Sequence, residues 1–370
     1  MRFKWKSLFF ILCAFFLLSN QIVQASENKV NKEHGNCGVQ YSVNKIKSKY
    51  ETDESHSYFD LHVKPGDQIV IESRIHNSYT NPIKIKQQAL TTFTNDNGEI
   101  SYTSKLKDDQ FDKSLKIKFS EISQIDRKSL LVVEPNSDKI VTMKINVPKD
   151  AQDGVILGSW YFEKENRENK DNKDNKKEAI QIHNKYSYAI GVKLTVNKEI
   201  EKPNLNLLSV DAGLSNYHKA FKALIQNDRP AIISRLNINA KITKKDNKHV
   251  LFRSNRQDII MAPNSNFNYP IMLGDKKLKP GEYTLYLQAR TNDPKWQTKS
   301  WKWKKNFRVS AEESKNLNAK AINDNQQHLN LWWILLGTLL FVLILILLIL
   351  YNKIRKYKQK LEQMERGNAK

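Results

Sequence analysis

The chain has 370 residues, of which 61 are Lys or Arg and 39 are Asp or Glu, for a formal net charge of +22. This length suggests two domains besides targeting segments, and the positive charge favours anionic partners. The two cysteines exclude a disulfide framework, because Cys13 lies in a predicted secretion signal and only Cys37 follows it. The Cys37 thiol could stay free or pair between two chains.

The N-terminus predicts a cleaved signal peptide over residues 1–25. Arg2, Lys4 and Lys6 are basic, residues 8–18 are apolar, and the small-residue cleavage site Val23-Gln24-Ala25 follows. The apolar run is short for a membrane span, so an uncleaved anchor is the weaker alternative.

Most apolar stretches between residues 26 and 310 alternate with period two, which indicates half-buried antiparallel strands. Examples are Ile69/Ile71, Leu115/Ile117/Phe119, Val141/Met143/Ile145/Val147, Leu236/Ile238/Ala240/Ile242 and Tyr283/Leu285/Leu287/Ala289. Many short strands of this kind predict an all-β exterior of two tandem immunoglobulin-like β-sandwiches.

A tight hairpin is predicted at Asn95-Asp96-Asn97-Gly98, because Asn-Gly tolerates the positive φ angles of such turns. Thr94, Asn95 and Asn97 are candidate ligands for a glycan or a peptide stem. Turn chemistry alone also explains both asparagines.

Two similar turn-and-strand segments predict an internal duplication. Pro135-Asn136-Ser137 precedes one alternating strand, and Pro263-Asn264-Ser265 precedes another, 128 residues further on. A glycine, Gly154 or Gly281, opens the next strand in each case. The repeat supports two sandwiches of one kind.

The predicted first domain covers residues 26–198 and includes a charged loop at 163–178, which is too polar to be buried. The predicted second domain covers residues 199–310. The alternative boundary lies at the charged loop itself, over residues 163–181. Residues 311–330 are a polar stalk, in which Ser310-Ala311-Glu312-Glu313 predicts a helix start by a capping box.

Residues 331–350 contain no charged side chain and are long enough for one transmembrane helix. Basic residues crowd the following segment, 351–370, whereas residues 322–330 contain no Lys or Arg. The positive-inside rule therefore predicts a single-pass protein of the cell membrane with an extracellular N-terminus and a cytoplasmic tail. This topology argues against nucleic acid as the partner.

Four tryptophans are candidates for partner binding. Trp296, Trp301 and Trp303 lie among lysines, and Trp301 and Trp303 share one face of a predicted strand. Trp160 lies in another predicted strand. Packing into the sandwich cores is the favoured explanation for Trp160, Trp301 and Trp303.

The sequence lacks the common catalytic and cofactor motifs, including His-Glu-x-x-His, Gly-x-Ser-x-Gly, a Gly-rich phosphate loop and Cys-x-x-Cys. His62 and His76 alternate with apolar strand residues, which favours solvent-facing positions over metal ligation. We therefore expect no enzyme activity, no cofactor and no metal site.

Four segments carry a resemblance to known proteins: Tyr58 to Asp67, Thr91 to Gly98, Ala179 to Val196, and Trp301 to Lys305 followed by the apolar span and basic tail. Together they resemble the WxL-interacting protein family of Gram-positive bacteria. The resemblance implies a first domain that binds peptidoglycan and a second that binds a WxL-domain surface protein or a host extracellular matrix protein. It implies a non-catalytic adapter at the Gram-positive cell surface.

Two features depart from the family pattern: the polar N-terminus with Cys37, and Gly158-Ser159-Trp160 before the charged loop. The alternative function is a membrane-bound assembly chaperone, because immunoglobulin-like domains can donate a strand to exported subunits by edge pairing. A wall-modifying enzyme is the least favoured reading.

Overall fold

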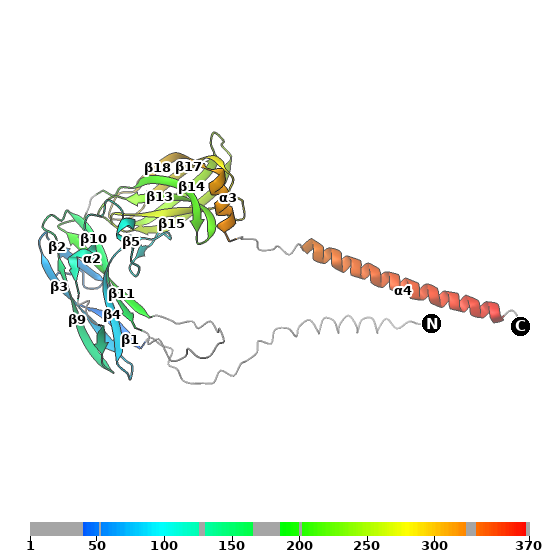
Figure 1. Cartoon of the computed structure of the whole chain (residues 1–370), viewed down its shortest axis with the longest axis horizontal. Helices are drawn as coiled ribbons and strands as arrows, with labels where there is room; N and C mark the ends of the chain where they lie inside the picture. Colours follow the sequence, from blue (N-terminus) through cyan, green and yellow to red (C-terminus); the bar gives the residue numbers. More distant parts are fainter. Residues whose placement is uncertain are drawn as a thin grey trace. The chain divides into compact units, whose positions relative to one another are not determined.

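The computed structural model describes residues 40–51, 53–125, 130–165, 186–199, 202–322 and 331–367 (Figure 1). The predicted signal peptide, Cys37 and most of the charged loop lie outside these residues. Every element below belongs to Tyr41–Lys370.

The first sandwich consists of two sheets (Figure 1). One has the order β1-β3-β9-β7, with β1 (Tyr41–Ile46), β3 (Gln68–Asn77), β9 (Ser137–Asn146) and β7 (Ser123–Gln124). The other has the order β2-β11-β10-β4-β8, with β2 (Phe59–Val63), β11 (Ser187–Val196), β10 (Gly154–Lys164), β4 (Ile83–Thr91) and β8 (Leu131–Val133). The β2–β11 pairing is parallel, and the other pairings in these sheets are antiparallel.

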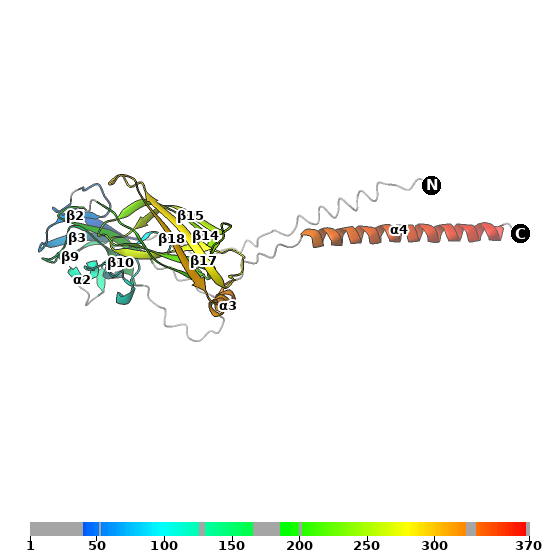
Figure 2. The ribbon, with the colours of Figure 1, turned by 90° about the horizontal axis from the view of Figure 1, so that it is seen from above.

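The second sandwich again pairs two sheets, and β14, β15, β17 and β18 lie side by side in Figure 2. The smaller sheet has the order β12-β13-β16, with β12 (Asn206–Ser215), β13 (His218–Asn227) and β16 (Ser265–Met272). The larger has the order β15-β14-β17-β18, with β15 (Val250–Met261), β14 (Ile233–Lys244), β17 (Gly281–Thr291) and β18 (Lys299–Val309).

Period-two alternation explains both cores. In β3, Ile69, Ile71 and Ile75 are buried while the residues between them are mostly exposed. The same rule buries Ile238, Ala240 and Ile242 of β14. The prediction of an all-β exterior with tandem sandwiches is therefore confirmed.

The predicted duplication is visible in the backbone. Asn136 and Asn264 both adopt φ of 47°, and Gly154 and Gly281 adopt φ of 127° and 133°. These positive values favour glycine and asparagine, which explains why the same residue types recur at both places.

A buried asparagine that the sequence did not single out joins two turns in each sandwich. Asn77 Nδ2 donates to the carbonyls of Asn81, Val133 and Glu134 at 2.9–3.0 Å. Asn227 Nδ2 donates to those of Ala231 and Ala262, both at 2.8 Å. Each amide thus satisfies carbonyls beside a Pro-Asn-Ser turn, where an unpaired group would be costly.

The predicted hairpin is present as β5 (Phe93–Thr94) and β6 (Ile100–Ser101), with φ of +73° at Gly98.

The strand predicted at Leu115 to Phe119 is wrong. After the short 3-10 helix η1 (Asp108–Gln110), the chain is irregular until Phe119 begins α2 (Phe119–Ile122). The Phe119 ring is fully buried over Gly158, where an added Cβ would lie 2.0 Å from it. Tertiary packing therefore overrides the local alternation.

The segment after β18 begins with the predicted helix, α3 (Ala311–Lys320). Ser310 and Glu313 form the capping box, which confirms that prediction. Ser314 is buried and its hydroxyl donates to the Leu278 carbonyl at 2.7 Å, so α3 is attached to the second sandwich.

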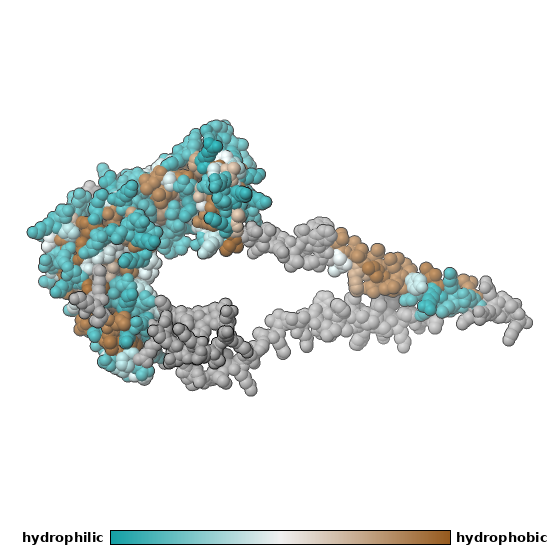
Figure 3. Space-filling view, viewed as in Figure 1, coloured by the Kyte–Doolittle hydropathy of each residue, from teal (hydrophilic) through white to brown (hydrophobic). Residues whose placement is uncertain are grey.

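The last helix, α4 (Leu331–Gly367), carries an apolar stretch followed by a hydrophilic end (Figure 3). Its segment Leu335–Glu362 has a mean hydropathy of 2.7 in its most apolar window and is long enough to cross a membrane, judged by length and composition.

Candidate functional site

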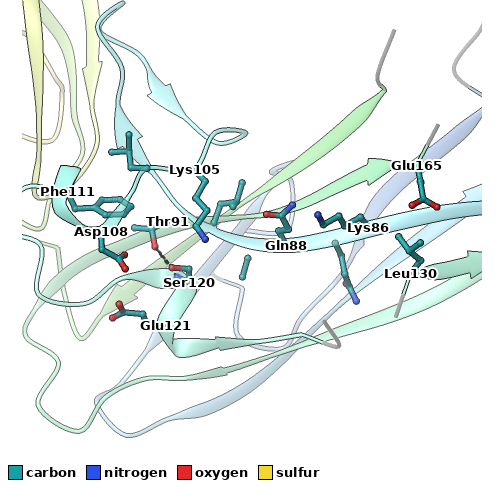
Figure 4. Close-up of a pocket in the computed structure, with 14 residues that line it drawn as sticks. Lys86, Gln88, Thr91, Lys105, Asp108, Phe111, Ser120, Glu121, Leu130 and Glu165 are labelled. Atoms are coloured by element: carbon teal, nitrogen blue, oxygen red, sulfur yellow. Dashed lines mark hydrogen bonds between the residues drawn. The ribbon is translucent and has the colours of Figure 1, made fainter. Parts of the chain in front are cut away.

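A groove of about 650 Å³ opens beside β4 on the first sandwich (Figure 4). Residues 86–91 of β4 form its floor. Its walls come from segment 105–121, together with Leu130 and Glu165. The groove is open to solvent.

Alternation along β4 sends chemically different side chains to its two faces. Ile83, Ile85 and Ala89 belong to the core. Lys86 and Gln88, which lie between them in sequence, face the groove. Lys86, Gln88 and Lys105 all line this groove (Figure 4).

The wall formed by α2 is fastened to the floor by a pair of hydroxyls. The Ser120 backbone N–H donates to Thr91 Oγ1 at 3.0 Å, and the two hydroxyl oxygens lie 2.9 Å apart (Figure 4). Together with buried Phe119, these bonds give the groove a fixed edge.

Acidic side chains at this edge are held by one lysine. Lys118 Nζ donates to Asp108 Oδ1 at 3.0 Å and to Glu121 Oε1 at 3.1 Å. These hydrogen bonds raise the pKa of Lys118. The Phe111 ring lies 5.6 Å from the same nitrogen and adds an aromatic surface to the groove wall.

The remaining cations of the groove are available to a ligand. Within the described residues, neither Lys86 nor Lys105 forms an ion pair or a side-chain hydrogen bond. Two ammonium groups, the Gln88 amide and the Phe111 ring can together recognise carboxylates, amides and a sugar or aliphatic surface. Among these same described parts of the chain, no group of three His, Cys, Asp or Glu side chains could hold a metal ion.

The predicted hairpin residues have intrachain partners. Thr94 is buried, and its Oγ1 accepts from the Ala262 N–H at 2.9 Å and lies 2.6 Å from Ser265 Oγ. Asn95 Oδ1 accepts from the backbone N–H groups of Asn97 and Glu99. The Asn97 side chain is exposed.

The four tryptophans pack against the cores. Trp160 is fully buried, and its Nε1 donates to Gln87 Oε1 at 3.0 Å. Trp296, Trp301 and Trp303 are partly buried against the second core. Trp296, Trp301 and Trp303 do not lie with the groove residues, which are on the first sandwich.

The groove residues were not among the sequence candidates. The sequence could have indicated Lys86 and Gln88, because they alternate with Ile83 and Ile85 and so lie on the strand face that points away from the core. Lys105 and Phe111 lie in an irregular segment with no period, so no sequence pattern places them beside β4.

Tandem sandwiches with an open, polar groove are typical of binding proteins. A model of the WxL Interacting Protein peptidoglycan binding domain matches residues 41–164, and one of the host binding domain of the same family matches residues 177–319. The chain therefore belongs to the WxL-interacting protein family. Both models describe binding domains, and their order along the chain is the predicted one.

No curated protein matches this chain. Solved structures similar to it include the Pseudomonas aeruginosa CupB2 chaperone, with 9% identity, coverage of 64% of this chain and 91% of that one, and a TM-score of 0.25. A chain of a chaperone–tip adhesin complex of CFA/I fimbriae has 11% identity, coverage of 66% and 94%, and a TM-score of 0.30. A chain of the Salmonella enterica SafA pilin–SafB chaperone complex has 9% identity, coverage of 65% and 97%, and a TM-score of 0.25. With TM-scores this low, none of these likenesses bears on function.

Proposed function

We propose that this protein is a non-catalytic adapter, held at the membrane by α4, that binds peptidoglycan with its first sandwich and a WxL-domain or host protein with its second. The observation that carries the proposal is the order of the two family matches, 41–164 and 177–319, ahead of one apolar helix.

The groove beside β4 is the proposed peptidoglycan site. Peptidoglycan carries acetamido groups on its sugars and carboxylates on its stem peptides. Lys86 and Lys105 would pair with carboxylates, and Gln88 would bond an amide. Phe111 would cover an apolar sugar face.

The proposed boundary between the two domains lies after β11, near residue 199. Support comes from the pairing of β11 with β10 and β2 in the first sandwich, although the host-binding match begins at residue 177. Glu199 follows β11 and pairs with Lys193 at 2.8 Å. The charged loop would then be an excursion within the first domain.

Sedimentation with purified sacculi tests the groove. We expect the full-length protein in detergent to sediment with sacculi, and Lys86→Gln with Lys105→Gln to raise the Kd roughly tenfold, since two exposed charge pairs contribute about 1.4 kcal/mol together. The matched control is Lys277→Gln with Lys279→Gln, which removes two exposed lysines from the second sandwich.

Two results would reject the groove: wild-type protein that stays in the supernatant, or an equal loss in the control. Capture of WxL-domain proteins and host matrix proteins by the same preparations tests the second sandwich separately.

A further inference from the structure

The outer side of the β15-β14-β17-β18 sheet carries a row of large exposed side chains that crosses all four strands. The strand register places Arg253 opposite Lys241, Lys241 opposite Tyr286, and Tyr286 opposite Lys304. All four are exposed, and their sequence neighbours Ala240, Ile242, Leu285 and Leu287 are buried in the core. The row therefore points away from the sandwich.

The adjacent row adds amides and a further cation. Asn255 lies opposite Asn239, Asn239 opposite Gln288, and Gln288 opposite Lys302. Arg290 is exposed two residues beyond Gln288 on β17. We define the basic face by its large side chains, which are Lys241, Arg253, Tyr286, Arg290, Lys302 and Lys304.

The charges on the basic face are not compensated within the protein. In the part of the chain that the structure describes, none of its five cations takes part in an ion pair. The nearby acid Glu282 pairs with Lys245 at 2.6 Å instead. Lys241 and Arg253 lie directly opposite each other at the ~4.8 Å spacing of neighbouring strands, an arrangement of like charges that destabilises a sheet.

An anionic ligand would offset this repulsion. The kind of anion follows from what surrounds the cations. Lysine is depleted in protein–protein interfaces, but here Lys241 and Lys304 lie on either side of Tyr286 across the strands. The Lys304 Nζ lies 5.7 Å from the Tyr286 ring centroid. A sheet face of cations, amides and one exposed ring suits a linear, charged sugar chain.

We propose that the basic face binds a sulfated polysaccharide of the host surface. The proposal rests on the host-binding role proposed for the second sandwich and names its site and ligand chemistry. Sulfates along the chain pair with Arg253, Lys241 and Lys304 across the strands. The Asn239 and Gln288 amides bond sugar hydroxyls in the next row.

Binding of heparin oligosaccharides to the full-length protein in detergent tests this assignment. The triple variant Lys241→Gln, Arg253→Gln, Lys304→Gln should raise the Kd at least ~10-fold. It should also reduce the slope of log Kd against log salt concentration by about three, one for each cation removed. The matched control, Lys277→Gln with Lys279→Gln and Lys315→Gln, removes three exposed cations elsewhere on the second sandwich and its attached helix. It should change the Kd by less than ~2-fold, because distant exposed charges are screened.

Lys241→Glu separates binding from folding. It places opposite charges across β14 and β15, so we expect an unchanged or higher Tm together with weaker heparin binding. Equal losses in the triple variant and its control would overturn the proposal, as would tighter binding of poly(glycerol phosphate) than of heparin. If heparin fails to bind while the same protein still captures host matrix proteins, the proposed ligand is wrong and the proposed host-binding function stands.

Discussion

At the scale of single residues, Asp112 joins groups from both sandwiches through one buried carboxylate. Gln226 Nε2 donates to it at 2.9 and 3.1 Å, and Asn266 Nδ2 donates at 2.6 Å. Ser114 donates through its N–H and hydroxyl at 2.8 and 2.6 Å. Burial alone would raise the pKa of Asp112, but these hydrogen bonds outweigh it and hold the pKa below its ordinary value. The contact therefore depends on the ionised form.

Asp112→Asn should lower the free energy of unfolding by about 1–3 kcal/mol at pH 7, because its NH₂ group would face donors instead of accepting from them. A group with a lowered folded pKa stabilises above its unfolded pKa, and this contribution is lost as pH falls through the folded value. The deficit of the variant should thus shrink below about pH 3.9. Urea unfolding of the full-length protein at several pH values measures both effects. Asp109→Asn, at an exposed neighbouring position, should not lower the free energy of unfolding at any of these pH values.

At the scale of elements, period two predicts the long strands because each has one buried face, as in β3 and β14. It fails where a short segment is shaped by its neighbours. α2 has four residues, too few to form a helix on their own. It exists because Phe119 fills the space that Gly158 leaves on β10. Neither residue reveals the other in the sequence.

The same limit applies to the sites. Alternation predicts that Trp301 and Trp303 share a face and that Lys302 and Lys304 share the opposite one. It does not give the register that aligns Lys304 with Tyr286 and Lys241 across separate strands. The groove likewise depends on segment 105–121 lying beside β4, which is a tertiary fact.

Gly158→Ala tests the link between α2 and the groove. The new Cβ would lie 2.0 Å from the Phe119 ring, so we expect about 1–3 kcal/mol of destabilisation from overpacking and weaker binding to sacculi. Gly213→Ala is the matched control in β12, because the Cβ there meets the flexible Lys222 side chain at 2.9 Å. Thermal unfolding and sedimentation measure the two effects. A Gly158→Ala protein as stable as the control would show that Phe119 can move without cost.

At the scale of the whole molecule, both proposed binding surfaces belong to the same chain as the apolar helix α4. A groove for peptidoglycan and a face for host polysaccharide are useful only where the two ligands occur, outside the membrane. Side chains after the apolar part of α4 are basic, namely Lys353, Arg355, Lys356, Lys358 and Lys360, whereas residues 322–330 contain no Lys or Arg. This asymmetry favours a cytoplasmic tail.

The proposed orientation predicts a labelling pattern for single cysteines in a background with Cys13→Ser and Cys37→Ser. Lys277→Cys lies on an exposed loop of the second sandwich and should react with a membrane-impermeant maleimide on intact protoplasts. Lys360→Cys, which is exposed near the end of α4, should react only after the membrane is broken, because the basic segment is retained inside. Equal labelling of both cysteines on intact protoplasts would mean that α4 does not cross the membrane. Labelling of Lys360→Cys alone would show the opposite orientation, in which both proposed binding surfaces lie inside the cell.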